Sequence, residues 1–370
     1  MNIAIYRFTY GSKLLADKFE RYWGGAVCCV GISEQSPEFT IYHIYQLYLD
    51  HKIDKIVLSS MDGRKVIMKE IEELCNIGFD KKDILIASIE LMYSENEIEM
   101  DQAFIENESF FYLDTLLIPV TEHCNLNCKG CSHFSPLVNR ESFLDYEMFC
   151  KDLLQLKTYI PHTDQINLLG GEPLLHNQLD KFILFARTVY PFAKINIVTN
   201  GILVRQMPEH LIQAIRETDS TVLLSVYPIM TKQTSDILNY LLKQNIRFYL
   251  LEMGDFTPML SKKYSEFPAE TTEMICSNCN MLQNGVLARC PMFLTIEYFN
   301  DYFHVQYPYK EAWIDIYDSE LTSKKIFEQL NKIYKLCNYC ARYKMPYAGM
   351  RKWSCYHVNE KKEITDWVIE

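Results

Sequence analysis

The chain has 370 residues, of which 48% are hydrophobic and 23% charged, a composition ordinary for a globular protein with two or three domains. Its formal net charge is −11, and Lys and Arg are scattered rather than gathered in a basic stripe, which disfavours a nucleic-acid partner. No run approaches the roughly 18 apolar residues of a membrane span, and the first residues lack a signal-peptide pattern. We therefore expect a cytoplasmic protein with no nucleic-acid and no membrane partner.

Strands alternate with helices over the first part of the chain. Strand-like runs occupy 2–7, 26–33, 55–60 and 83–88, and helical patterns occupy 42–52, 67–78 and the stretch around Ala16 and Phe19. This alternation predicts βαβ units and a parallel sheet, and residues 1–92 resemble the small Rossmann-like modules of bacterial surface-polysaccharide pathways. Only Gly11 follows the first strand, so the dinucleotide fingerprint is missing. We expect this module to dock or position something and not to bind a nicotinamide cofactor.

An acidic stretch at 94–109 reads as a linker, and the alternation resumes over 110–255. The predicted strands are 114–123, 165–172, 194–201, 221–228 and 246–253, and the predicted helices are 143–160, 179–190, 208–218 and 235–245. Such an α/β series predicts a barrel or partial (β/α) barrel with its function at the carboxyl ends of the strands. Beyond Pro258 the regularity ends, and residues 256–370 are expected to form a separate cysteine-rich domain.

Nine of the 13 cysteines fall into two groups, which indicates metal binding or catalysis in a chain without an export signal. Cys124, Cys128 and Cys131 form the first group, just after the first strand of the second series. Three thiolates at this spacing suit three corners of a cubane cluster and leave one iron without a protein ligand. Zinc stays an alternative, because His123 or His133 could complete a set of four ligands.

The stretch CNLNCKGCSHFSPL at 124–137 resembles the radical S-adenosylmethionine (SAM) superfamily. Further matches follow in the family's order, each at the end of a predicted strand: Gly170-Gly171-Glu172-Pro173, Thr199-Asn200-Gly201, and Ser225 with Tyr227. One departure is Gly130, where many members carry an aromatic residue before the third cysteine.

The resemblance implies a fold, a cofactor set and a first chemical step. It implies a radical SAM partial barrel in which the first three cysteines hold a [4Fe-4S] cluster. Gly170, Gly171 and Glu172 are expected to hold the methionine amino group of SAM, and Asn200, Ser225 and Tyr227 to complete the SAM site. The reduced cluster would cleave SAM to a 5′-deoxyadenosyl radical, which takes a hydrogen atom from the substrate.

The second cysteine group resembles the SPASM/twitch extension of the same superfamily. Cys276 and Cys279 precede Gly285-Val-Leu-Ala-Arg-Cys290, which reads as a short hairpin, and Cys337-Asn-Tyr-Cys340 follows. The resemblance implies a second, auxiliary [4Fe-4S] cluster held by Cys290, Cys337, Cys340 and either Cys276 or Cys279, with Cys276 preferred for its longer loop. A zinc ribbon is the alternative for a pair of CxxC motifs.

Cys355, the last cysteine, has two interpretations. It is an inert buried thiol, or it donates a hydrogen atom to a substrate radical, as a cysteine does in epimerase-type relatives.

The leading functional hypothesis is an oxidoreductase or epimerase of the twitch type. It would act at a C–H bond of a small-molecule or glycan substrate, with an electron donor such as flavodoxin or ferredoxin. It rests on the likeness to aminoglycoside-type dehydrogenases with one auxiliary cluster, and on the first module by analogy. One rival is a peptide maturase, against which the α/β pattern before residue 90 argues. The other is a non-catalytic iron–sulfur or zinc protein, which has no need of the glycine-glycine-glutamate and Thr-Asn-Gly segments.

Overall fold

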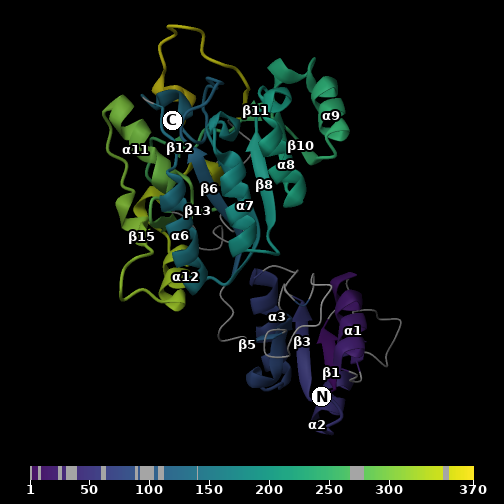
Figure 1. The fold of residues 1–370 in the computed structure, drawn as a ribbon. Helices are drawn as coiled ribbons and strands as arrows, with labels where there is room; N and C mark the ends of the chain where they lie inside the picture. The colour runs from purple at the N-terminus through teal and green to yellow at the C-terminus, as the bar shows by residue number, and fades with distance from the viewer. Residues whose placement is uncertain are drawn as a thin grey trace. The chain divides into compact units, whose positions relative to one another are not determined.

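The computed structural model describes residues 2–6, 10–23, 27–30, 40–59, 64–87, 91, 104–106, 112–139, 141–266, 279–344 and 350–370. The chain divides into two compact units, Met1–Asp114 and Thr115–Glu370 (Figure 1). None of the helices described is both long enough and apolar enough to cross a membrane.

The first unit is built on a five-stranded sheet in the order β2-β1-β3-β4-β5. Its strands are β1 (Ile3–Tyr6), β2 (Val27–Val30), β3 (Lys55–Ser59), β4 (Ile84–Ala87) and β5 (Phe104–Glu106). Its helices are α1 (Tyr10–Trp23), α2 (Ile41–Leu49) and α3 (Arg64–Ile77). The pairs β1–β2, β1–β3 and β3–β4 are parallel, as the alternating sequence predicts, and β5 is antiparallel to β4.

Strand β5 corrects the interpretation of residues 94–109 as a linker. Phe104 and Ile105 are apolar residues within this acidic stretch, and Ile105 pairs with Ile86 of β4. The Phe104 ring packs against Phe19 of α1, with ring centroids 6.4 Å apart. Burial of this ring favours strand formation over the solvated linker that the local charge indicates.

The second unit holds an eight-stranded sheet in the order β10-β9-β8-β7-β6-β13-β14-β15. Its first five strands in sequence are β6 (Tyr112–Thr121), β7 (His162–Gly170), β8 (Lys194–Thr199), β9 (Thr221–Val226) and β10 (Arg247–Glu252). The others are β13 (Asn280–Gln283), β14 (Val286–Ala288) and β15 (Ile314–Asp315). The pairs β7–β8, β8–β9, β9–β10 and β6–β13 are parallel, so the carboxyl ends of the central strands share one edge.

Helices follow these strands as the periodicity predicts. They are α6 (Tyr146–Tyr159), α7 (Leu179–Val189), α8 (Glu209–Glu217) and α9 (Thr234–Lys243). Helices α6, α7 and α8 lie side by side (Figure 1). The Asp145 side chain caps α6 by accepting a hydrogen bond from the backbone N–H of Met148 at 2.9 Å. The strand–helix series confirms the predicted α/β architecture with parallel strands in this part of the chain.

The predicted hairpin after Cys279 is formed by β13 and β14, with Asn284 and Gly285 at its turn. Both turn residues have positive φ, 48° and 78°. The buried carboxylate of Asp152 in α6 accepts a hydrogen bond from the Gly285 backbone N–H at 2.8 Å, which fixes the turn against the helix. Because the hairpin continues the sheet of β6, strands on both sides of residue 255 share one sheet, and the domain boundary proposed there stays a prediction.

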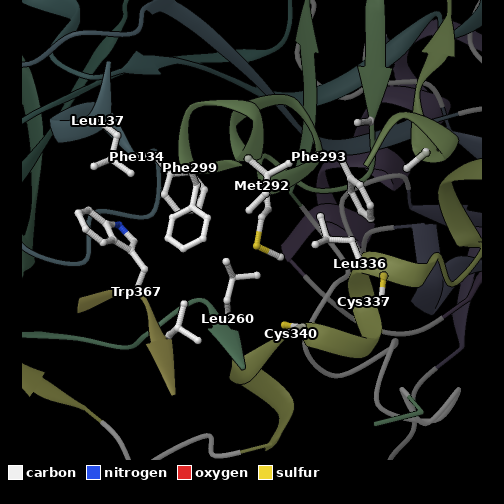
Figure 2. Close-up of a cluster of buried hydrophobic side chains, with 14 of the residues drawn as sticks. Phe134, Leu137, Leu260, Met292, Phe293, Phe299, Leu336, Cys337, Cys340 and Trp367 are labelled. Atoms are coloured by element: carbon white, nitrogen blue, oxygen red, sulfur yellow. The ribbon is translucent and has the colours of Figure 1, made fainter. Parts of the chain in front are cut away.

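The remaining elements are β11 (Asp255–Phe256), β12 (Leu260–Ser261), β16 (Arg351–Lys352), β17 (Val368–Ile369), α11 (Met292–Phe303), α12 (Ser323–Asn331) and α13 (Ala341–Lys344). Of these, β12, α11 and β17 contribute buried residues to a second core. Figure 2 shows the core, in which the rings of Phe134, Phe299 and Trp367 lie together and Cys337 lies toward the opposite end. Phe134 belongs to the first cysteine motif, so this core joins the cysteine loop to the C-terminal part of the chain.

Candidate functional site

A cavity of about 350 Å³ lies where strands β6, β7, β8 and β9 end. This volume is within the range of small-molecule sites, about 300–1,000 Å³. Most of the residues predicted for the first cluster and for SAM line it: Cys124, Cys128, Cys131, Gly170, Gly171, Asn200, Ser225 and Tyr227. Chain segments far apart in the sequence therefore meet at one cavity, because the carboxyl ends of parallel strands lie on one edge.

The three cysteines of the first group lie close enough to influence one another electrostatically. Burial raises the pKa of all three thiols, that of Cys124 to about 12, and the charge of Cys131 raises the pKa of Cys124 and Cys128 further. Hydrogen bonds oppose this effect, from the Leu126 backbone to Cys124 and from the loop backbone to Cys131. Thiols crowded in this way ionise only beside a compensating positive charge, so this set of donors suits a thiophilic metal centre.

The arrangement of ligands bears on the choice between a cluster and a zinc ion. In the part of the chain that the structure describes, no three His, Cys, Asp or Glu side chains converge on a single metal ion. Zinc needs its ligands to converge in that way, whereas the three thiolates of a cubane each bind a different iron. His123 is also engaged elsewhere, since its Nδ1 lies 2.9 Å from the Thr121 hydroxyl and its ring contacts Phe143. Three cysteines at this spacing suit a [4Fe-4S] cluster, and zinc with His133 as the fourth ligand stays the alternative.

Gly170 and Gly171 let the end of β7 approach the start of the cysteine loop. Gly170 has φ of 133°, and a Cβ atom there would lie 2.0 Å from the carbonyl oxygen of Thr121. A Cβ atom on Gly171 would lie 1.9 Å from the carbonyl oxygen of His123. Two backbone hydrogen bonds replace those clashes, from Gly171 N–H to Thr121 and from Glu172 N–H to His123, at 2.8 and 3.0 Å. The glycine pair is thus needed for the backbone contact that positions Cys124.

Glu172 lies behind the cavity wall. Its side chain is fully buried, and its Oε1 accepts hydrogen bonds from the Thr199 hydroxyl at 2.6 Å and the Leu174 backbone at 3.1 Å. Its Oε2 accepts from the Asn200 backbone N–H at 2.9 Å. Burial raises the pKa of Glu172 to about 7, and these hydrogen bonds act in the opposite direction. In the structure the Glu172 carboxylate binds the turn after β8 through Thr199 and Asn200. Its contact with the methionine ammonium group of SAM stays a prediction.

Asn200 connects that turn to the cysteine loop. Its Nδ2 donates to Asn125 Oδ1 at 2.7 Å and lies 3.7 Å from Cys124 Sγ. Its Oδ1 accepts from the Ile202 backbone N–H at 3.0 Å. Gly201, with φ of 83°, completes the turn. The Thr-Asn-Gly segment therefore holds the cavity wall in place and presents an amide to Cys124, the first of the predicted ligands.

Three aromatic rings gather beside the cavity. The ring centroid of Tyr227 lies 5.4 Å from that of Trp353, with an interplanar angle of 34°, and 6.0 Å from that of Phe256. Burial raises the pKa of Tyr227, so its hydroxyl stays protonated at neutral pH. Tyr227 and Phe256 give the cavity an apolar border, and Trp353 packs on Tyr227 without lining the cavity itself.

His133 is a lining residue with one ring nitrogen that is unpaired among the described residues. Its Nδ1 is buried and has no hydrogen-bond partner among the residues described. Burial lowers the pKa of His133 to about 4, so the imidazole is neutral at physiological pH. An unpaired buried polar atom costs roughly 1–3 kcal/mol, a cost that a polar ligand in the cavity would relieve.

Polar and apolar side chains alternate at the part of the cavity formed after β10. They are Met253, Asp255, Phe256, Thr257, Met259 and, from α13, Arg342. An acid, a hydroxyl and a guanidinium offer both hydrogen-bond donors and acceptors to a bound molecule. This wall suits a polar organic substrate.

A segment near the end of the sequence covers the cysteine loop. The Lys129 backbone N–H donates to the Ser354 carbonyl at 2.9 Å, and the Tyr356 N–H donates to the Asn127 carbonyl at 2.8 Å. Between these two hydrogen bonds, Cys355 and Cys128 form a β-bridge. Trp353 Nε1 donates to Cys128 Sγ at 3.2 Å. Cys355 therefore lies beside Cys128, a predicted cluster ligand, and is not among the residues that line the cavity.

The second cysteine group is only partly gathered. Cys337 and Cys340 are buried in the core of Figure 2, and Cys290 packs against it. Burial raises the pKa of the Cys279 thiol, and the nearby positive charge of Arg342 partly offsets this rise. Cys276 lies outside the described residues. The auxiliary ligand set stays a prediction.

The sequence did not single out several residues of this site. Arg342 and Asp255 carry no motif and reach the cavity only through the fold, and Trp353 likewise belongs to no motif and reaches Cys128 only through the fold. His133 stood in the first motif, where the sequence indicated a metal ligand but not an unpaired group in the cavity wall.

Comparison with known proteins agrees with the site. The family model described as the Radical SAM superfamily matches residues 118–228, which contain all the predicted residues from Cys124 to Tyr227. The chain therefore contains a radical SAM domain, as the four sequence motifs predict.

Curated relatives are similar over that domain. The GTP 3',8-cyclase of Sulfurovum sp. (strain NBC37-1) is 31% identical over 136 residues, 35% of this chain and 41% of the relative. The GTP 3',8-cyclase of Aliarcobacter butzleri (strain RM4018) is 36% identical over 106 residues, 27% of this chain and 31% of the relative. The 7,8-dihydro-6-hydroxymethylpterin dimethyltransferase of Methanocaldococcus jannaschii is 34% identical over 93 residues, 24% of this chain and 18% of the relative. The chain thus spans less than half the length of these relatives.

Solved structures show distant likeness. The structure of BtrN in complex with AdoMet and 2-DOIA has a TM-score of 0.41 and 18% identity, covering 62% of this chain and 93% of that chain. The structure of anSMEcpe with bound AdoMet and the Kp18Cys peptide has a TM-score of 0.38 and 15% identity, covering 65% of this chain and 89% of that chain.

Proposed function

We propose that the chain is a radical SAM enzyme that takes a hydrogen atom from a polar, carbohydrate-type substrate. The supporting observation is the cavity that brings Cys124, Cys128 and Cys131 together with the ends of β7, β8 and β9. When bound, the cluster and SAM would supply a 5′-deoxyadenosyl radical, the chemistry of this superfamily. The chain's own residues position the two groups, exclude water and orient the substrate.

Each part of the cavity has its own task in this proposal. The three cysteines would bind three irons and leave the fourth open to SAM. The backbone at Gly170 and Gly171, the amide of Asn200 and the hydroxyl of Ser225 would contact the polar groups of SAM. Asp255, Thr257 and Arg342 would bind substrate hydroxyl groups at the other part of the cavity, which is the support for a polar substrate.

We further propose an auxiliary [4Fe-4S] cluster as the acceptor of the substrate's second electron. Three of its candidate ligands, Cys290, Cys337 and Cys340, lie in or against one core. Oxidation of a secondary alcohol removes one hydrogen atom, one proton and one further electron. Cys290, Cys337 and Cys340 would hold the cluster that, when bound, supplies an acceptor for that electron, with flavodoxin or ferredoxin as the external redox partner.

Iron content and SAM cleavage test the proposal. Anaerobically reconstituted chain is expected to carry about eight irons, and a triple alanine variant of the first group about four. With dithionite and SAM the wild type is expected to form 5′-deoxyadenosine, and the triple variant none. A wild type that binds iron but never cleaves SAM would favour the non-catalytic rival. Stoichiometric zinc without iron–sulfur absorption would refute both cluster assignments.

The auxiliary ligands need separate variants. Cys337→Ala and Cys340→Ala are each expected to leave about four irons and intact SAM cleavage. Of Cys276→Ala and Cys279→Ala, only the variant of the true fourth ligand should lose iron. Full iron content in all four variants would remove the auxiliary cluster from the proposal.

A further inference from the structure

Trp353 is placed to act on the first cluster through one ligand. Its indole Nε1–H donates a hydrogen bond to Cys128 Sγ at 3.2 Å, across 225 residues of sequence. The acceptor is the sulfur atom itself, which would bind iron in the proposed function. We propose that Trp353 sets the reduction potential of the SAM-binding cluster by donating this hydrogen bond to the Cys128 sulfur.

The chain holds the indole from several directions. The Trp353 backbone N–H donates to the Gly254 carbonyl at 2.9 Å, next to the antiparallel pair of β16 and β11. Its ring packs against that of Tyr227, with the ring centroids 5.4 Å apart. The residues that follow pair with the cysteine loop on both sides of Cys128. These contacts hold the donor beside the Cys128 sulfur, so little reorientation is needed when the cluster is reduced.

Elementary electrostatics gives the sign of the effect. One-electron reduction makes the cluster more negative, and an N–H dipole pointing at a ligand sulfur stabilises the more negative state. Hydrogen bonds to sulfur are among the factors that set the potential of iron–sulfur clusters. Trp353 therefore makes the cluster easier to reduce. It is a positioning and tuning residue, since it contacts a ligand and not the cavity.

Trp367 offers a matched comparison on the same loop. Its indole Nε1–H donates to the backbone carbonyl of Cys131 at 2.9 Å, not to a sulfur atom. Tryptophan-to-phenylalanine exchange at either position removes one indole N–H and keeps an aromatic ring. Only the exchange at Trp353 removes a hydrogen bond from a ligand sulfur.

The test is a redox titration of the reconstituted full chain followed by electron paramagnetic resonance. The inference rests on the proposed function, so the titrated signal is the one that changes when SAM is added. A wild type without any SAM-responsive signal would refute the proposed function. Where the wild type has that signal, the two variants decide the role of Trp353.

Trp353→Phe is expected to shift the midpoint of the SAM-responsive signal to a more negative potential. At a fixed ambient potential the ratio of reduced to oxidised cluster should fall about tenfold, which corresponds to about 59 mV for a one-electron couple. Trp367→Phe should lower stability and leave the midpoint at the wild-type value. An unchanged midpoint in Trp353→Phe, or an equal shift in both variants, would overturn the proposal.

A measurement on the wild type keeps the proposal testable if Trp353→Phe binds less iron. Protein labelled with nitrogen-15 in its tryptophan indoles is reduced, and the magnetic coupling of that nitrogen and its exchangeable proton to the SAM-responsive cluster is recorded. A resolved coupling supports the hydrogen bond to Cys128. Absence of coupling in fully loaded wild type would show that no indole N–H reaches a ligand sulfur.

Discussion

The backbone N–H of Asn200 donates to Glu172 Oε2 at 2.9 Å, and this hydrogen bond joins the ends of β8 and β7. The first residue belongs to the Thr-Asn-Gly segment and the second to the Gly-Gly-Glu segment. Two motifs that the sequence presents as separate SAM contacts are therefore parts of one hydrogen-bonded unit behind the cavity wall.

Glu172→Gln and Thr199→Val are expected to weaken SAM binding together. Each removes part of the same hydrogen-bonded unit, because the Thr199 hydroxyl donates to Glu172 Oε1 at 2.6 Å. We expect the dissociation constant of SAM to rise about tenfold or more in each variant, as for loss of a buried charge-assisted hydrogen bond. Equilibrium binding of SAM to the reconstituted chain measures this dissociation constant. If only the Glu172 variant loses affinity, the carboxylate contacts SAM directly, as the resemblance implied.

Gly171→Ala is expected to destabilise the fold by more than about 1 kcal/mol and to lower iron content, because its Cβ atom would lie 1.9 Å from the His123 carbonyl oxygen. Gly254→Ala is the matched control, since a Cβ atom there has nothing within 4 Å. Its free energy of unfolding should stay within about 0.5 kcal/mol of the wild type. Chemical denaturation and iron analysis of both variants measure these effects. Equal stability of the two variants would contradict the close approach of β7 to the cysteine loop.

Stability should fall at mildly acidic pH, in part through His176. Burial lowers the pKa of His176, although its hydrogen bond to the Leu144 carbonyl at 3.1 Å acts in the opposite direction. The pKa of histidine in the unfolded chain is about 6.5, so below this pH the unfolded chain binds a proton at His176 that the folded chain does not. This difference favours unfolding as the pH falls. The stabilities of wild type and His176→Gln, compared at pH about 5.5 and about 7.5, should show a weaker pH dependence in the variant. Parallel pH profiles would exclude His176 as a source of the effect.

Cys355→Ala is expected to retain turnover. The thiol lies beside Cys128 in the backbone bridge and outside the cavity lining, so it is poorly placed to return a hydrogen atom to a substrate radical. Turnover in deuterium oxide should give an oxidised product with no deuterium at the original centre. An inverted, deuterium-labelled product whose formation stops in the Cys355→Ala variant would identify an epimerase instead.

The sequence predicted the strand–helix order well, because most strands are short apolar runs between amphipathic helices. KINIVT at 194–199 and TVLLSV at 221–226 form β8 and β9 where the pattern places them. Strand β5 was missed because its apolar residues are surrounded by acidic ones in the sequence. The packing of Phe104 against Phe19, which favours the strand, is visible only in the structure.

The candidate site was predicted where its residues lie in short motifs at strand ends. The role of Glu172 was less well predicted, because a motif shows which residues are near SAM but not which of them are already saturated by hydrogen bonds within the chain. Trp353 and Arg342 could not be predicted. Trp353 reaches Cys128 across 225 residues of sequence, and Arg342 reaches the cavity only through the placement of α13.

The pairing of 353–356 with the cysteine loop also has a consequence for biosynthesis. Trp353 follows Cys128 by 225 residues, which a ribosome adding about 5–20 residues per second takes roughly 10–45 s to make. Throughout that interval the three thiols of the loop have neither their indole donor nor the segment that covers them. We expect cluster insertion to follow synthesis of this segment, and chains released before it to be the ones whose thiols oxidise first in air.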